Sequence, residues 1–176
     1  MRTKTPTHYV NNKDLYKALV IHKNEKQQSE TELRVPEYVG ECILLITNKL
    51  SDRPNFNKYS YKDEMIADAI ENCLMAVNNF NVEKYFNPHA YFTMIAWNAF
   101  VRRIEKEKRQ VYLKYKNYKK QLSSEELSNS NYGYNPAALA SDDIIDDFIK
   151  NYEEAIQRKK KKREQSERGV EKFMKD

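Results

Sequence analysis

The side chains best suited to chemistry are three histidines and two cysteines, and they are scattered along the chain. His8, His22 and His89 lie far apart, and none belongs to an HExxH motif. Cys42 and Cys73 each occupy an apolar helical position, and no CxxC or Cys/His spacing suited to zinc is present. We therefore expect two buried free thiols in a cytosolic protein, with no metal site and no cofactor.

Signatures of catalysis are also missing from the sequence. The chain has three glycines, no Gly-rich phosphate-binding loop, and no local Ser–His–Asp or Cys–His arrangement. Glu64, Asp68 and Glu71 are spaced along one predicted helix, as in an interaction surface. An active-site carboxylate pair more often sits in a pocket lined by several segments. We expect a binding protein rather than an enzyme.

Basic residues are concentrated in one part of the chain. The 176 residues carry a net charge of +5, with 31 Lys or Arg against 26 Asp or Glu. Residues 102–120 contain nine Lys or Arg and two Glu, a net charge of +7, and Tyr112, Tyr115 and Tyr118 alternate with lysines there. Phosphate attraction and base stacking would suit a nucleic acid. The alternative is a solvated helix whose tyrosines pack on a neighbouring element.

Apolar periodicity predicts an all-α chain in which short helices position these side chains. Asn12 is expected to cap a helix over 13–26 that turns Leu15, Leu19 and Ile21 inward. Pro36 opens a second helix that ends near Leu50. Its apolar stripe consists of Val39, Cys42, Ile43, Ile46 and Leu50.

Residues 63–107 form the most regular stretch and predict two helices separated by a break at 78–81. The first presents acidic residues opposite its apolar stripe, namely Glu64, Asp68 and Glu71. Asn87 is a good N-cap for the second helix, and Pro88 suits its first position. The second helix should turn inward Tyr91, Phe92, Ile95, Ala99 and Phe100.

Composition predicts five segments: a disordered N-terminus (1–11), a helical domain (12–120), a linker (121–140), a C-terminal helix (141–165) and a tail (166–176). Ser141 should cap the C-terminal helix, whose acidic first half precedes the basic block 158–163. The apolar stripe of this helix must bury against the main body or a partner. No apolar run approaches ~20 residues, so no membrane span is expected.

Four sequence blocks carry a family resemblance. They are EMIADAIE at 64–71, NF at 79–80, KYFNPHAY at 84–91 and NAFVRRIEKE at 98–107. The stretch resembles region 2 of bacterial sigma factors, and it is more similar to the late-transcription sigma factors of T-even-type bacteriophages. The resemblance covers residues 36–115, and NPHAY followed by NAFV is its most specific part.

This resemblance implies a compact helical domain like sigma region 2, with a long basic helix. It implies a phage-encoded factor in the cytoplasm of the infected bacterial host, which binds the host RNA polymerase core and melts a short AT-rich late promoter element. Glu64, Asp68 and Glu71 would dock on the β′ clamp helices. The residues implied to contact promoter DNA are Lys84, Phe86, Tyr91, Met94, Ile95, Asn98, Arg102, Arg103 and Lys106.

Individual roles follow from the same resemblance. Phe86 and Tyr91 would stack on unpaired bases, and Asn98 would read a base at the upstream edge of the element. The alternative for Tyr91 is a place in the core. Met94 and Ile95 stand where primary sigma factors carry a pair of tryptophans.

The resemblance also implies two phage partners, a late co-activator and the DNA sliding clamp. In the family, a short C-terminal peptide docks on the clamp. Here Val170, Phe173 and Met174 follow Gly169 at i, i+3 and i+4, so one helical turn would present all three. The alternative is a frayed end with incidental apolar residues.

Two other classes of protein remain open. One is a basic helical protein that binds nucleic acid without polymerase, which explains the charge but not the acidic helix face. The other is a structural helical adaptor whose tyrosines are core. Binding to RNA polymerase core separates the first interpretation from both.

Overall fold

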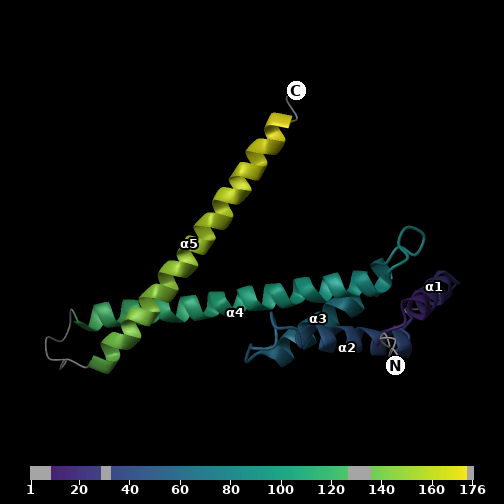
Figure 1. Ribbon diagram of the computed structural model, residues 1–176, viewed down its shortest axis with the longest axis horizontal. Coiled ribbons are helices and arrows are strands. Elements are labelled where there is room, and N and C mark those ends of the chain that lie inside the picture. The colour runs from purple at the N-terminus through teal and green to yellow at the C-terminus, as the bar shows by residue number, and fades with distance from the viewer. Residues whose placement is uncertain (1–8, 29–32, 127–135, 174–176) are drawn as a thin grey trace, which may run out of the picture. The chain divides into compact units, whose positions relative to one another are not determined.

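A computed structural model describes residues 9–28, 33–126 and 136–173, and their side chains except those of 122–126, 136–141 and 167–173 (Figure 1). No strand occurs among these residues, which confirms the predicted all-α class. None of the described helices is long and apolar enough to cross a membrane. In chain order the elements are α1 (Asn12–Gln28), α2 (Glu37–Ser51), α3 (Lys62–Ala76), the 3-10 helix η1 (Val77–Asn79), α4 (Pro88–Glu126) and α5 (Pro136–Phe173).

The chain divides into two compact units, Met1–Glu105 and Lys106–Asp176. The division falls inside α4, whereas the sequence prediction keeps 12–120 together. The first unit contains α1 to α3 and the beginning of α4. The second unit contains the rest of α4 and α5.

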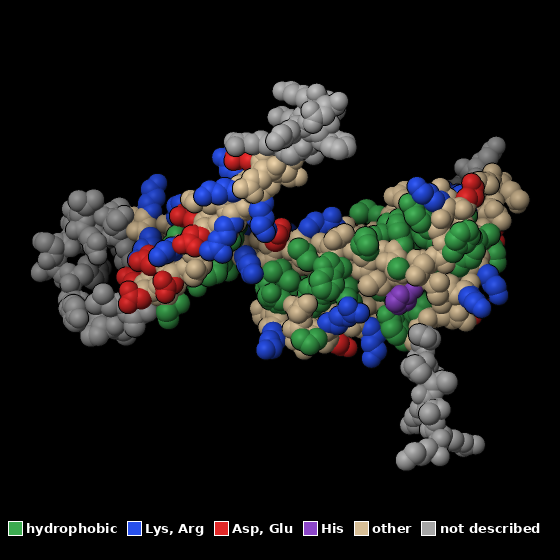
Figure 2. All heavy atoms as spheres, turned by 45° about the horizontal axis from the view of Figure 1, so that its top comes forward, with side chains coloured by type: hydrophobic (Ala, Val, Ile, Leu, Met, Phe, Trp, Pro, Cys, Tyr) green, Lys and Arg blue, Asp and Glu red, His purple; other side chains and the backbone are tan. Residues whose placement is uncertain are grey.

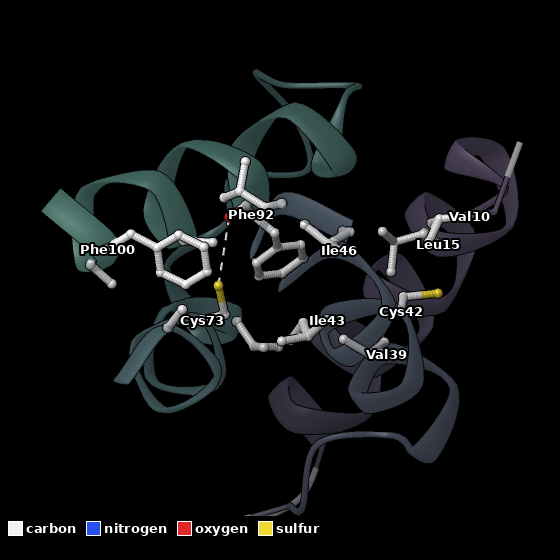
Figure 3. Close-up of a cluster of buried hydrophobic side chains, with 14 of the residues drawn as sticks. Val10, Leu15, Val39, Cys42, Ile43, Ile46, Cys73, Phe92 and Phe100 are labelled. Atoms are coloured by element: carbon white, nitrogen blue, oxygen red, sulfur yellow. Dashed lines mark hydrogen bonds between the residues drawn. The ribbon is translucent and has the colours of Figure 1, made fainter. Parts of the chain in front are cut away.

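The core of the first unit forms where α1, α2, α3 and the start of α4 meet (Figure 3). All five residues of the predicted α2 stripe are buried, and Phe92 and Phe100 from α4 are fully buried beside them. Both cysteines are free and buried, as predicted. The thiol of Cys73 donates to the carbonyl oxygen of Phe92 at 3.6 Å, and burial raises its pKa to about 12.

Helix α1 differs from the prediction at two points. Ile21 is 57% exposed, and His22 is buried in its place, because Leu15, Leu19 and His22 share a face at i, i+4 and i+7. The N-cap is Asn11, whose side-chain oxygen accepts the backbone N–H of Lys13 at 3.0 Å. Asn12 therefore does not cap α1, which differs from the prediction.

In the second unit, α5 packs on the later part of α4 through aromatic rings. Tyr112 stacks on Tyr152 with centroids 4.6 Å apart, and Tyr115 meets Phe148 edge-on at 5.3 Å. Phe148 and Tyr152 of the α5 stripe thus pack on α4 while staying partly exposed, whereas Ile144 and Ile156 of the same stripe are 69% and 48% exposed. Tyr112 and Tyr115 accordingly pack on a neighbouring helix. Both helices exceed the predicted bounds: α4 reaches Glu126, and α5 begins before Ser141 and continues to Phe173.

Candidate nucleic-acid and protein interface

The start of α4 is fixed by its predicted cap. The side-chain oxygen of Asn87 accepts the backbone N–H of Ala90 at 3.0 Å, and its carbonyl accepts that of Tyr91 at 3.3 Å. Pro88, the first helical residue, is fully buried and lacks the N–H that would otherwise need a partner. The helix that carries most of the predicted DNA contacts therefore begins at a defined point.

Helix α1 holds the segment 80–87, which leads into α4. The Asn12 side chain accepts the backbone N–H of His89 at 3.0 Å and donates to the carbonyl of Phe86 at 3.3 Å. The Tyr16 hydroxyl donates to the carbonyl of Val82 at 2.8 Å. Sequence reasoning misses Asn12 and Tyr16 as positioning residues, because their partners lie 66 to 77 residues further along the chain.

Aromatic side chains are exposed on this held segment. Phe86 is 68% exposed, although the ring of Tyr16 lies 5.8 Å from its centroid. Tyr85 is also exposed, and the ammonium of Lys84 lies 5.4 Å from the centroid of its ring. An exposed aromatic ring beside a cation is the combination that binds unpaired bases and their phosphates.

One face of α4 is also exposed within the first unit. Met94, Asn98 and Arg102 follow each other at intervals of four residues, so they lie along one side of the helix, and all three are exposed. The guanidinium of Arg102 donates to the side-chain oxygen of Asn72 at 2.8 Å. Ile95, predicted with this set, is only partly exposed and packs against the core.

Tyr91 belongs with the core rather than with the exposed set, which is the alternative left open by the sequence. Its ring packs between Phe80 and Phe92, with centroids 5.1 and 5.3 Å away. Its hydroxyl donates to the carbonyl oxygen of Ala76 at 3.1 Å, and burial raises its pKa. The structure thus gives Tyr91 a packing role that base stacking would have to disrupt.

The acidic face of α3 is only partly free. Glu64 and Glu71 are exposed, as the sequence predicts. Asp68 instead lies 3.4 Å from the guanidinium of Arg103, whose side chain is only 16% exposed. Asp68 and Arg103 are predicted to serve two different partners, and the structure pairs them with each other.

Tyr112, Tyr115 and two lysines of the basic segment are engaged within the second unit, whereas Tyr118 is 42% exposed. Lys116 donates to the carboxylate of Glu153 at 3.0 Å, and Lys119 donates to that of Asp146 at 2.9 Å. Hydrogen bonds from Tyr112 and then Lys116 lower the pKa of Glu153. Acidic and basic side chains lie close together on this α4–α5 hairpin (Figure 2).

No protein-family model matches this chain, and no curated protein matches it. Functional assignment therefore depends on the sequence blocks and on the geometry. No cluster of His, Cys, Asp or Glu suited to a metal ion occurs in the part of the chain that the structure describes.

The remaining predicted sites belong to the second unit. Lys106 is exposed on α4, but it is the first residue of the second unit. Val170 and Phe173 lie near the end of α5, where side chains fall outside the described residues, as does all of Met174. The surface assembled in the first unit therefore comprises Lys84, Tyr85, Phe86, Met94, Asn98 and Arg102, hereafter the aromatic–basic surface.

Proposed function

We propose that this chain is a phage late-transcription sigma factor that binds the host RNA polymerase core and opens AT-rich promoter DNA in the host cytoplasm. The observation that carries the proposal is Phe86, which is 68% exposed while its backbone is tied to α1 through Asn12. Burying an apolar ring is favourable, so a large ring kept exposed on a fixed backbone suits a partner. Unpaired bases, which offer a flat apolar face, fit it well.

Promoter opening then follows from the order of groups on the aromatic–basic surface. Phe86 stacks on a base that has left the duplex, and Lys84 neutralises the adjoining phosphate. Asn98 donates and accepts at a base edge, as an amide side chain can do with adenine. Extrusion of a base costs a few kcal/mol, which stacking at about 1–3 kcal/mol per base offsets in large part.

The polymerase is bound through α3 in this proposal. Glu64 and Glu71 remain exposed, and Met75 on the same helix is 65% exposed. Exposed acids steer a basic surface such as that of the β′ clamp helices and set its register. Val170, Phe173 and Met174 are proposed to tether the complex to the phage sliding clamp, with a late co-activator as the further partner.

Permanganate footprinting tests the proposal, because permanganate oxidises unpaired thymines. The template is a negatively supercoiled plasmid with an AT-rich late promoter of a T-even-type phage, mixed with bacterial core polymerase and the chain. Phe86→Ala should reduce thymine reactivity about tenfold, given the stacking energy per base. Ile21→Ala removes a similarly exposed apolar side chain from α1, away from the residues proposed to bind DNA and polymerase, and should leave reactivity unchanged. An undiminished bubble with Phe86→Ala contradicts the role of Phe86.

A further inference from the structure

Positive charge in the second unit is concentrated in one block of α5. Residues 106–120 of α4 contain seven Lys or Arg and one Glu (+6), and residues 142–154 of α5 contain six acids and one Lys (−5). The two segments pair through Lys116–Glu153 and Lys119–Asp146, so together they are close to neutral at +1. Residues 158–163, which follow these two segments in the chain, are all Lys or Arg and carry a charge of +6.

We propose that residues 158–163 of α5, hereafter the basic block, bind the phosphate backbone of duplex DNA. All six residues are helical and exposed, and Arg158 also contacts Glu154 at 2.9 Å. Six helical residues extend over about 9 Å, and duplex DNA carries one charge per about 1.7 Å of its axis. About five phosphate charges thus lie along an equal length of duplex, enough for every cation that the helix turns toward the DNA.

Duplex DNA fits the basic block better than a single strand does. Single-strand binders combine cations with aromatic rings on which bases stack. Residues 158–166 contain no aromatic residue, and Tyr152, which precedes them, is stacked on Tyr112 at 4.6 Å. A contact made of cations alone reads the backbone and is independent of sequence.

A protein partner is a poorer fit for the same block. The centres of protein interfaces are depleted in lysine and rely on Trp, Tyr or Arg anchors in apolar surroundings. Four of the six residues are lysines, and Ala155 and Ile156 are the nearest preceding apolar residues. Like charges at i and i+4, such as Arg158 and Lys162, also destabilise a helix, and a polyanion would relieve that repulsion.

This inference concerns a second surface, and free chain with free DNA is sufficient to test it without polymerase. Fluorescence anisotropy measures binding of the full chain to a labelled 20-base-pair duplex of mixed sequence at several salt concentrations. The variant K160Q/K161Q/K162Q removes three charges from the block. The matched control K108Q/R109Q/K114Q removes three exposed charges from α4.

We expect the block variant to bind the duplex more weakly, with a slope of log K against log salt smaller in magnitude by about 3. The control should keep most of that slope, and circular dichroism should show both variants to be as helical as the parent chain. If the two variants lose equal affinity for the duplex, net charge alone determines binding, and the proposal is overturned. Loss of binding to poly-glutamate but not to the duplex overturns it as well, in favour of an acidic protein partner.

Discussion

The guanidinium of Arg103 on α4 lies 3.4 Å from the carboxylate of Asp68 on α3. Their side chains are 16% and 38% exposed, so the pair is partly shielded from water and salt. Beside it, Arg102 donates to Asn72, and the side-chain amide of Asn72 donates to the carbonyl of Asp68 at 2.6 Å. These contacts set how α4 packs on α3, and so connect the aromatic–basic surface to the acidic helix.

A double-mutant cycle tests this pairing. Asp68→Asn and Arg103→Gln should each lower the free energy of unfolding by about 1 kcal/mol, near the upper end for a partly exposed pair. The double variant should lose less than the sum, because the second change removes a contact that is already broken. Denaturant titration gives the three values, and Asp63→Asn, an exposed acid on the same helix, serves as the control. Additive losses would show that the two residues do not interact.

Asp68 is accordingly a poor choice for probing polymerase binding, and Glu64 and Glu71 are better ones. Reversing both to lysine should weaken binding to RNA polymerase core about tenfold, because exposed charges that face a basic partner then repel it. The melting temperature should stay nearly unchanged, since both side chains are exposed. The control Asp63→Lys also adds a positive charge to α3. Equal core affinity for the double variant and this control would exclude the acidic face as the docking surface.

The sequence predicts the helices and most of the core because periodicity is a local property. The α2 stripe repeats at helical spacing, and each of its residues is buried. Contacts between distant segments have no such local signal. The choice of Asn11 over Asn12 as the cap of α1 depends on Phe86 and His89, which are close only in the folded chain.

Tyr16 is expected to hold the Phe86 segment in place without touching DNA. Tyr16→Phe removes the hydroxyl that donates to Val82 but keeps the ring beside Phe86. A lost hydrogen bond is worth about 1 kcal/mol, so promoter opening should fall by roughly fivefold. Core affinity should not change. Footprinting and core titration provide the two readouts, and Tyr118→Phe, in the second unit, is the control. A parallel fall in core affinity would instead indicate a general loss of structure.

The α4–α5 hairpin should depend on pH through Glu153 and Lys116. Hydrogen bonds from Tyr112 and Lys116 lower the pKa of Glu153 in the folded chain. Glu153 therefore stabilises the hairpin above its unfolded pKa of 4.5, and this stabilisation is lost as the pH falls. Hydrogen bonds to Tyr112 and then to Glu153 raise the pKa of Lys116 in the folded chain. Lys116 therefore stabilises the hairpin below its unfolded pKa of 10.5, and this stabilisation is lost as the pH rises beyond that value.

The hairpin should therefore be most stable between these limits. Near-ultraviolet circular dichroism reports the stacked pair Tyr112–Tyr152 across the pH range. In Glu153→Gln, the acid-induced loss of hairpin stability that arises at this contact should disappear. Glu164→Gln replaces an exposed acid outside the contact and serves as the control. An unchanged acid transition in Glu153→Gln would show that other groups set it.

Helical spacing alone does not show which residues of the candidate site are buried and which are exposed. Tyr91 and Met94 both belong to the segment that resembles sigma factors, yet Tyr91 packs against the core and Met94 is 67% exposed. The difference arises because Phe80 and Ala76 approach Tyr91 from the end of α3 and the segment after it. Tyr112 and Tyr115 are a similar case, since their partners lie on α5, beyond any local pattern.

Binding to RNA polymerase core is the decisive measurement for the proposed sigma function. The chain, labelled at its N-terminus, is titrated with purified bacterial core, alone and with an excess of a primary sigma factor. We expect saturable binding that the primary sigma factor displaces, because both proteins would occupy the same clamp helices. If the chain does not bind core but still binds duplex DNA, it is not a sigma factor, and the result would favour a nucleic-acid-binding protein that acts without polymerase.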